Sequence, residues 1–370
     1  MKTKLNQFYP LVAAGALAFA ATPAIADHGS RTNSGYLQFN LVSDISTNAF
    51  RTDARLLNPW GLAAGPGSIW VNDNHSGLTT VYGPSGRRSD FAINIPAPGG
   101  GPAAPTGLVF NDTSKFVISN GNRHDESTFV MSTEDGTLTA WSQRISGPDA
   151  VIVATTPDAV YKGLALARDT NGAPHIYAAN FHGGVVDVFD GQFQYVSSFT
   201  DSNLPPNFAP FNVRNIRGKL FVTFALQKLP DAEDDQAGPG NGYIDIFDTD
   251  GTMLRHFASQ GVLNSPWGLA VAPANFGKFS RALLVGNFGD GTINAFDLLS
   301  GKSLGPLTQP NGDPIVIAGL WALSFERDEV FDRECEFNAQ RLYFTAGPND
   351  EEDGLLGLIQ PVSPFFRRGD

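Results

Sequence analysis

The chain has 370 residues, of which 25 are basic and 37 acidic, so its formal charge is −12 at pH 7. A protein this acidic gains nothing from phosphate backbones or anionic membranes, which excludes nucleic acid and membrane surfaces as expected partners. Forty glycines and 25 prolines favour short strands joined by turns. The single cysteine, Cys335, excludes an internal disulfide, and the adjacent carboxylates of Glu334 and Glu336 argue against a reactive thiolate.

The first 26 residues have the three parts of a secretory signal peptide. Lys2 and Lys4 precede an apolar run over residues 11–21, and small residues at 24–26 form a cleavage site. The apolar run is shorter than the roughly 20 residues of a membrane-spanning helix, and no later segment approaches that length. We therefore expect cleavage before Asp27, no membrane insertion, and export of a soluble protein to the periplasm or the extracellular space.

One sequence pattern, which predicts three short strands, is repeated along the chain, and its clearest copy occupies residues 264–297. Each apolar run is bounded by Gly, Pro, Asn or Asp, and Gly289-Asp290-Gly291 suits a tight hairpin. A repeat of this length with three or four strands per unit predicts the blades of a β-propeller, here an all-β domain of six blades over residues 27–362. The positions equivalent to Gly268 fall at 61, 107, 163, 212, 268 and 322.

The two ends of this repeat array have complementary deficits. Residues 36–42 alternate like a strand but precede the first full unit, whereas the sixth unit ends after its third strand. We expect the N-terminal strand to complete the last blade and close the ring, with residues 363–370 as a short tail. A seven-bladed ring is the alternative, because residues 116–119 and 129–132 both resemble the second strand of the second unit.

Seven motifs occupy residues 58–62, 161–166, 180–184, 208–212, 264–270, 285–291 and 344–350. In their order they resemble an uncharacterised family of exported bacterial proteins that also has a giant-virus member. The resemblance spans essentially the whole mature chain. It implies a six-bladed propeller similar in architecture to NHL-repeat proteins and gluconolactonases, and it implies no particular function.

Candidate functional residues fall where each first strand begins and in the loops between second and third strands, which share the top face of a propeller. Asn and Asp-Gly often only shape turns, and Trp-Gly often packs one blade on the next. For the face as a whole we favour a ligand site, because loops on a rigid scaffold usually carry function. The candidates are Trp60, Asn72, Asn74, His75, Asn120, Lys162, Asn180, His182, Trp267, Asn287, Asp290, Trp321, Asn349 and Asp350.

A divalent metal, Ca²⁺ or another ion, is an open expectation. His75 and His182 occupy equivalent loops of the first and third units, and imidazole with carboxylate oxygen suits several metals. Asp234 and Asp235 belong to an acidic run in the long insert of the fourth unit, where oxygen ligands suit Ca²⁺. Such runs are more often solvated loops, and no other cofactor motif is present.

Two functions remain open from the sequence. The favoured one is an exported, monomeric binding module whose top mouth takes a small molecule, glycan or peptide through Trp stacking and Asn hydrogen bonds. The alternative is a metal-dependent hydrolase resembling the gluconolactonases, in which an ion polarises a lactone carbonyl or activates water. That chemistry needs carboxylates at the axis, yet none of the six residues that open the first strands is acidic, and Lys162 among them opposes a cation. A quinone-dependent oxidoreductase is the least favoured.

Overall fold

The computed structural model describes residues 35–65, 67–325 and 340–362. The expected signal peptide, the C-terminal tail and Cys335 lie outside these ranges. Within them the chain is almost entirely β-structure, and its one helical element is the 3₁₀ turn η1 (Gly277–Phe279). No helix in the described ranges has the length and apolar character to cross a membrane.

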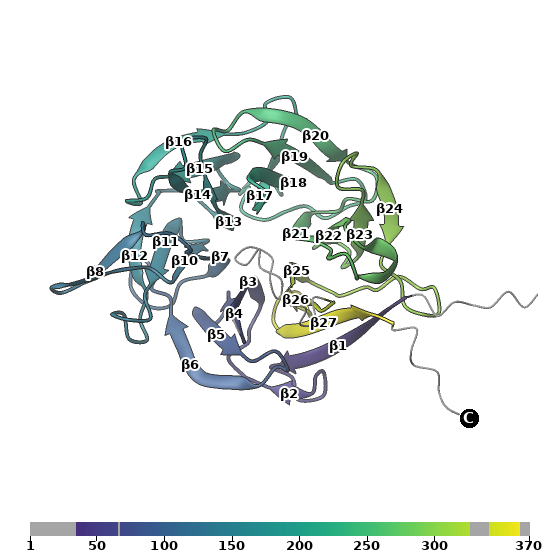
Figure 1. The fold of residues 1–370 in the computed structure, drawn as a ribbon, viewed down its shortest axis with the longest axis horizontal. Coiled ribbons are helices and arrows are strands. Elements are labelled where there is room, and N and C mark those ends of the chain that lie inside the picture. The colour runs from purple at the N-terminus through teal and green to yellow at the C-terminus, as the bar shows by residue number, and fades with distance from the viewer. Residues whose placement is uncertain (1–34, 66, 326–339, 363–370) are drawn as a thin grey trace, which may run out of the picture. The chain divides into compact units, whose positions relative to one another are not determined.

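The described strands form six blades around a common axis, which confirms the all-β propeller (Figure 1). Strands pair antiparallel within each blade. From the axis outward, blade 1 contains β3 (Pro59–Gly65), β4 (Ser68–Asp73), β5 (Leu78–Tyr82) and β6 (Arg88–Asn94). Blade 2 contains β7 (Pro105–Phe110), β10 (Phe129–Thr133), β11 (Thr137–Trp141) and β12 (Val151–Thr155). Blade 3 contains β13 (Tyr161–Arg168), β14 (Pro174–Asn180), β15 (Val185–Phe189) and β16 (Tyr195–Phe199). Blade 4 contains β17 (Phe208–Ile216), β18 (Lys219–Leu226), β19 (Gly242–Phe247) and β20 (Met253–Ser259). Blade 5 contains β21 (Pro266–Val271), β22 (Leu283–Asn287), β23 (Ile293–Phe296) and β24 (Ser303–Pro306). Blade 6 contains β25 (Leu320–Phe325), β26 (Leu342–Ala346), β27 (Leu355–Pro361) and β1 (Tyr36–Ser43).

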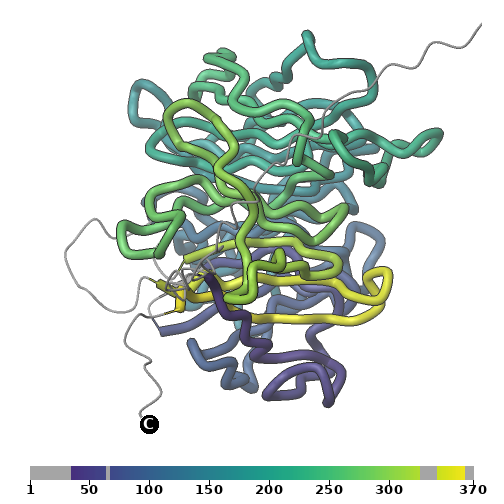
Figure 2. The backbone as a smooth tube through the Cα atoms, turned by 90° about the vertical axis from the view of Figure 1, so that its right-hand side faces the viewer, coloured from purple at the N-terminus to yellow at the C-terminus, as the bar shows by residue number. Residues whose placement is uncertain are grey.

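The N-terminal strand closes the ring, as the sequence predicted. β1 pairs antiparallel with β27, from Tyr36 opposite Pro361 to Ser43 opposite Leu355. Both views show the purple β1 beside the yellow C-terminal strand (Figures 1 and 2). The short β2 (Arg51–Thr52) adds a parallel pairing outside β1. Joining the two ends of the chain in one sheet leaves no gap between the first and last blades.

The surplus strand of the second unit belongs to a hairpin, so the seven-bladed alternative is wrong. β8 (Val117–Asn120) pairs only with β9 (Arg123–Glu126) among the described strands, and this hairpin projects from the ring beside blade 2 (Figure 1). The second strand of the blade is β10, which pairs with both β7 and β11. The fully buried β10 fits a central strand, whereas β8 exposes three of its four residues.

The repeated glycine permits close contact between neighbouring inner strands. A Cβ on Gly61 would lie 2.2 Å from the carbonyl oxygen of Thr106 in the next blade. A Cβ on Gly268 would lie 2.6 Å from the carbonyl oxygen of Trp321. Real Cβ atoms do not approach oxygen so closely, so these positions of the repeat require glycine.

Polar side chains on the first or second strand of one blade donate to a carbonyl on the inner strand of the next. Asn72 Nδ2 donates to Gly107 O at 3.0 Å, and Asn212 Nδ2 donates to Trp267 O at 2.7 Å. Thr345 Oγ1 donates to Trp60 O at 2.6 Å and so connects blade 6 back to blade 1. Inner-strand carbonyls that cannot pair along their own sheet are satisfied in this way.

Candidate functional site

A cavity of about 370 Å³ lies where the starts of the inner strands meet the loops between second and third strands. We call it the mouth cavity. Eight of its twelve residues come from the inner strands or the loops between second and third strands of blades 1, 3, 5 and 6. The others come from the β10–β11 loop and from the insert between β18 and β19. The lining residues are Trp60, Asn74, His75, Glu134, Lys162, Lys228, Asp234, Asp235, Phe288, Trp321, Asp350 and Glu351.

Stacked aromatic rings form the base of the mouth cavity. The rings of Trp60 and Trp321 are 3.5 Å apart at 21°, and those of Trp321 and Phe288 are 4.0 Å apart at 22°. Trp60 and Trp321 are only 2% and 1% exposed, whereas Phe288 is partly exposed. The expected stacking of a ligand on the tryptophans is therefore restricted, because the indoles cover one another, and Phe288 offers the accessible ring.

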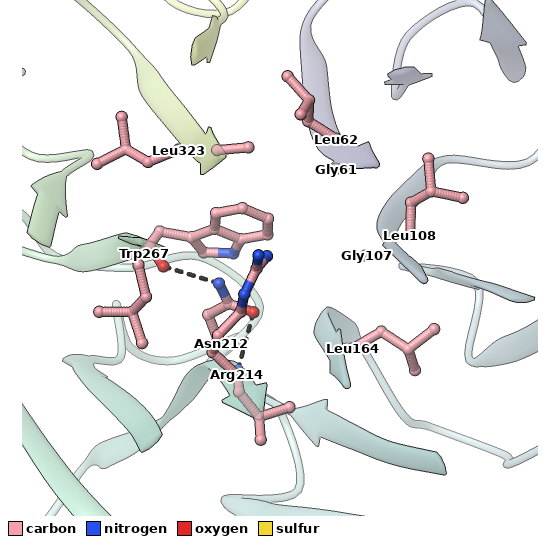
Figure 3. Close-up of a pocket in the computed structure, with 12 residues that line it drawn as sticks. Gly61, Leu62, Gly107, Leu108, Leu164, Asn212, Arg214, Trp267 and Leu323 are labelled. Atoms are coloured by element: carbon pink, nitrogen blue, oxygen red, sulfur yellow. Dashed lines mark hydrogen bonds between the residues drawn. The ribbon is translucent and has the colours of Figure 1, made fainter. Parts of the chain in front are cut away.

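Below these rings the axis is filled by side chains. Trp267 packs edge-on against Trp60 and Trp321, with ring centroids 6.4 and 5.7 Å apart, and donates from Nε1 to Lys162 O. A second cavity beside Trp267 has a volume of only about 20 Å³, room for about one water molecule. Figure 3 shows Trp267 and Arg214 side by side near the axis. Around them stand leucines of the inner strands, Leu62, Leu108, Leu164 and Leu323. The mouth cavity is thus closed at its base.

A buried ion pair joins blades 2 and 3 at the cavity wall. Lys162 Nζ contacts a carboxylate oxygen of Glu134, lies 3.6 Å from Asp234 Oδ1, and stands 5.0 Å from the centre of the Trp60 ring. Asn74 Nδ2 donates to the other oxygen of Glu134 at 2.9 Å. Burial alone would raise the pKa of Glu134 and lower that of Lys162, but their mutual attraction outweighs burial, so the pKa of Glu134 is lowered and that of Lys162 raised.

Glu351 is the carboxylate whose charge is least stabilised at the cavity. Burial raises the pKa of Glu351 to about 7, despite a 2.6 Å hydrogen bond from Asn58 Nδ2 and the nearby charge of Lys162. Asn349, Asp350 and Glu351 all have positive φ, of 58°, 52° and 68°. Asn and Asp tolerate this left-handed conformation, but Glu seldom adopts it. The loop therefore holds Glu351 at the cavity at some cost in backbone energy.

The acidic insert of blade 4 folds over the mouth cavity. The side chains of Asp234 and Asp235 line the cavity. Asp234 is 74% exposed, whereas Asp235 Oδ2 is buried and accepts no hydrogen bond from the described residues. Burial raises the pKa of Asp235. The accessible wall is consequently rich in carboxylates, with five carboxyl groups lining the cavity against two lysines.

The structure brings a little under half of the predicted residues to this cavity. The predicted residues that line it are Trp60, Asn74, His75, Lys162, Trp321 and Asp350, together with the metal candidates Asp234 and Asp235. Trp267 supports the base from below, and His182 lies at the insert, with Nδ1 3.1 Å from Asp231 O. Asn349 is an exposed neighbour of Asp350.

Other predicted residues hold turns or blade contacts. Asn72 is fully buried and bonds to blade 2 and to Thr79. Asn180 donates to Asp187 and accepts from Gly183 N, and Asn287 donates to Val262 O at 2.7 Å. Asp290 caps the same turn through Thr292. The polar atoms of these side chains are already hydrogen-bonded within their turns or to neighbouring segments. This was the simpler interpretation of the Asn and Asp-Gly motifs.

Asn120 was predicted at the mouth and Glu134 was not, because residues 116–119 resemble the second strand of blade 2 as closely as those of β10 do. Asn120 lies in the projecting hairpin and donates to Ile145 O, away from the cavity. Choosing β10 as the second strand would have placed Glu134 in the equivalent loop. The signal was Glu134-Asp135-Gly136-Thr137, which repeats the Asp-Gly-Thr turn of residues 290–292.

Neither His75 nor His182 belongs to the group of described residues that has metal-ligand spacing. Among the described residues, the three-residue group with metal-ligand spacing consists of Asp201, Asp245 and His256, at the junction of blades 3 and 4. His75 instead lies 3.4 Å from Asn58 Nδ2. His75 lines the mouth cavity, whereas His182 is not among its lining residues and contacts Asp231 O of the insert.

Two proteins of Acanthamoeba polyphaga mimivirus are similar in sequence. Uncharacterized protein R648 is 32% identical over 329 residues, which cover 86% of this chain and 78% of that protein. Uncharacterized protein L690 is 33% identical over 333 residues, covering 86% of this chain and 84% of that protein. This chain belongs to their family. A family with a giant-virus member was the one that the motifs indicated, and the names of these relatives assign no activity.

The fold also occurs among solved structures. Luciferin-regenerating enzyme aligns with a TM-score of 0.51 and 11% identity, covering 88% of this chain and 95% of that one. Identity this low compares the fold alone. No protein-family profile matches the chain.

Proposed function

We propose that this protein is an exported binding module whose mouth cavity takes a small ligand rich in hydrogen-bond donors. The donors are amines or hydroxyls, carried by a small molecule, a glycan or a peptide. The observation that carries the proposal is the carboxylate-lined wall over a closed aromatic base. A cavity of about 370 Å³ is within the size range of small-molecule sites.

The charges favour donors over anions. Lys162 is already paired with Glu134, so the accessible ionisable groups that face a ligand are the three carboxyl groups of Asp234, Asp350 and Glu351 and the single ammonium of Lys228. A ligand amine would gain charge-assisted hydrogen bonds there, and sugar hydroxyls would gain neutral-to-charged ones. The partly exposed ring of Phe288 supplies a flat apolar contact.

A binding screen tests the proposal. Neutral oligosaccharides, amino sugars and short peptides with a free amine are titrated calorimetrically into the protein. A ligand found in this way should bind about tenfold more weakly to Asp350→Asn and Glu351→Gln, since about 1.4 kcal/mol is a factor of ten. Asn120→Ala, in the projecting hairpin, is the control and should bind normally. Binding that survives both cavity variants but is lost in the hairpin variant would place the site elsewhere.

A hydrolase is the second candidate, and the pKa of about 7 at Glu351 favours it. A carboxyl group that titrates near neutral pH suits general acid–base catalysis. A metal-dependent form would have to draw its ligands from His75, Asp350 and Glu351, but among the described residues these do not form a group with metal-ligand spacing, and the charge of Lys162 opposes a cation. Hydrolysis assays on panels of lactones and esters, with and without added divalent ions, distinguish a metal-dependent hydrolase from a metal-independent one. Turnover that depends on the Glu351 carboxyl, and that Glu351→Gln abolishes, would favour the enzyme over the binding module.

A further inference from the structure

Two aspartates and one histidine meet on the outer part of the ring, away from the mouth cavity. Asp245 lies on β19 and is the register partner of His256 on β20. Asp201 follows β16, the outer strand of blade 3. His256 Nδ1 is 2.8 Å from Asp245 Oδ1 and 3.5 Å from Asp201 Oδ2. The three candidate ligand atoms lie within 4.8 Å of one another.

Both carboxylates of this triad are buried and incompletely satisfied. The side chains of Asp201 and Asp245 are 2% and 0% exposed. The Oδ2 atom of each accepts no hydrogen bond from the described part of the chain. Two adjacent buried carboxylates are costly unless a cation neutralises them.

The equivalent position of blade 3 shows that this arrangement is not a requirement of the fold. Asp187 occupies the same place in β15 as Asp245 in β19, within the repeated phrases of residues 185–190 and 243–248. There Asp187 Oδ2 accepts hydrogen bonds from Tyr161 and Asn180, and its cross-strand partner is Ser198. Blade 4 instead places a histidine opposite Asp245 and leaves Asp245 Oδ2 without a hydrogen bond from the described residues.

We propose that Asp201, Asp245 and His256 bind a divalent transition-metal ion, with Zn²⁺ the best fit, which joins the outer edge of blade 3 to blade 4. One imidazole and two carboxylates are zinc ligands, whereas Ca²⁺ prefers six or more oxygens. Ligands at about 2.0–2.2 Å from a tetrahedral ion are about 3.3–3.6 Å apart. The 3.5 Å separation of Asp201 Oδ2 from His256 Nδ1 matches this range, whereas the 2.8 Å hydrogen bond between His256 Nδ1 and Asp245 Oδ1 would have to lengthen when the ion binds. His256 is 49% exposed, which leaves room for water as the fourth ligand.

The test uses protein without a polyhistidine tag, stripped of metal with a chelator and then titrated with ZnCl₂. We expect one zinc ion per chain by mass spectrometry of the metal content, and a rise of a few degrees in melting temperature at about 100 times the Kd. Asp245→Asn and His256→Ser should lose both effects. The second variant gives blade 4 the serine that blade 3 has, and because His256 is half exposed it should fold even if Asp245→Asn does not.

Two control variants make the test specific. Asp187→Asn removes the matched carboxylate of blade 3, and His75→Ala removes the histidine of the mouth cavity; both should retain one zinc ion. Zinc that is retained by His256→Ser but lost by His75→Ala would overturn the assignment in favour of the mouth. Absence of saturable binding by the stripped wild-type protein of Zn²⁺, Mn²⁺ or Co²⁺ would overturn it altogether.

Discussion

The pair of Lys162 and Glu134 is the residue-scale feature with the largest expected effect on stability. Lys162 is 3% exposed, so Lys162→Met leaves the carboxylate of Glu134 without its ammonium partner. We expect a loss of about 3–5 kcal/mol in the free energy of unfolding, and recovery of much of it when Glu134→Gln is added. Urea unfolding measures both. Lys228→Met, an exposed lysine of the same cavity, should change stability by less than about 0.5 kcal/mol.

The pair also predicts a pH window. Because the pKa of Glu134 is lowered in the folded protein, its charge stabilises the fold above the usual carboxyl pKa, and this stabilisation is lost as pH falls through the folded-state pKa. Because the pKa of Lys162 is raised, its charge stabilises the fold below the usual lysine pKa, and this stabilisation is lost as pH rises through the folded-state pKa. The deficit of Lys162→Met should therefore persist at neutral pH and shrink in acid. An equal deficit at pH 3 and pH 7 would contradict the ion-pair explanation.

Glu351 should make the folded protein less stable as pH rises. Its pKa of about 7 lies above that of an unfolded glutamate, so the folded state binds more protons between about pH 4.5 and 7, and stability falls across that range. Glu351→Gln should flatten this decline and be roughly 1–3 kcal/mol more stable than wild type at pH 8, with little difference at pH 4. Thermal unfolding at a series of pH values measures this, and parallel curves for the two proteins would refute it.

At the scale of elements, the contact between the end of β22 and the segment that leads into β21 should depend on Asn287. This side chain donates to Val262 O and accepts from Asn264 N, and it is fully buried. Asn287→Ala should cost about 1–3 kcal/mol, because two backbone groups lose their partner. Calorimetry of unfolding tests this. Affinity for any mouth ligand should stay within about twofold once measured well below the melting temperature; a large loss of affinity in a stably folded variant would make Asn287 a ligand contact.

The closing strand β1 makes a second element-scale prediction. Its removal exposes the backbone of β27 as an unpaired edge, and unpaired edges promote association. A protein that begins at residue 44 should aggregate or unfold below the melting temperature of one that begins at residue 35. Size-exclusion chromatography and thermal unfolding compare the two. Two monomers of equal stability would show that the pairing with β27 is dispensable.

At the scale of the whole molecule, export remains a proposal that rests on the composition of the first 26 residues. Lys2, Lys4, the apolar run and the small residues at 24–26 predict that a secreting bacterial host releases a chain beginning at Asp27. Mass spectrometry of the released protein identifies its first residue. Light scattering of the same sample tests the expected monomer. An intact Met1 in the membrane fraction would reject the signal-peptide assignment.

The sequence by itself predicted six blades, with seven as the alternative, and the closure of the ring. Both follow from local patterns, since each unit carries its own Gly, strand and turn signals, and the unpaired strand signal of residues 36–42 matched the strand missing from the sixth unit. The same patterns placed Lys162 and His75 at the mouth, because the start of an inner strand and the loop after a second strand share one face in every blade.

Only the tertiary structure decided which polar residues are free to act. Asn287 and Glu134 both lie where a second strand ends. Asn287 is hydrogen-bonded within its own turn and to the segment before β21, whereas Glu134 faces Lys162 across a blade boundary. The union of Asp201 and Asp245 likewise depends on how blade 3 packs on blade 4. Periodicity reports which face a residue lies on, but partners, burial and pKa depend on contacts between units distant in sequence, and no local pattern encodes them.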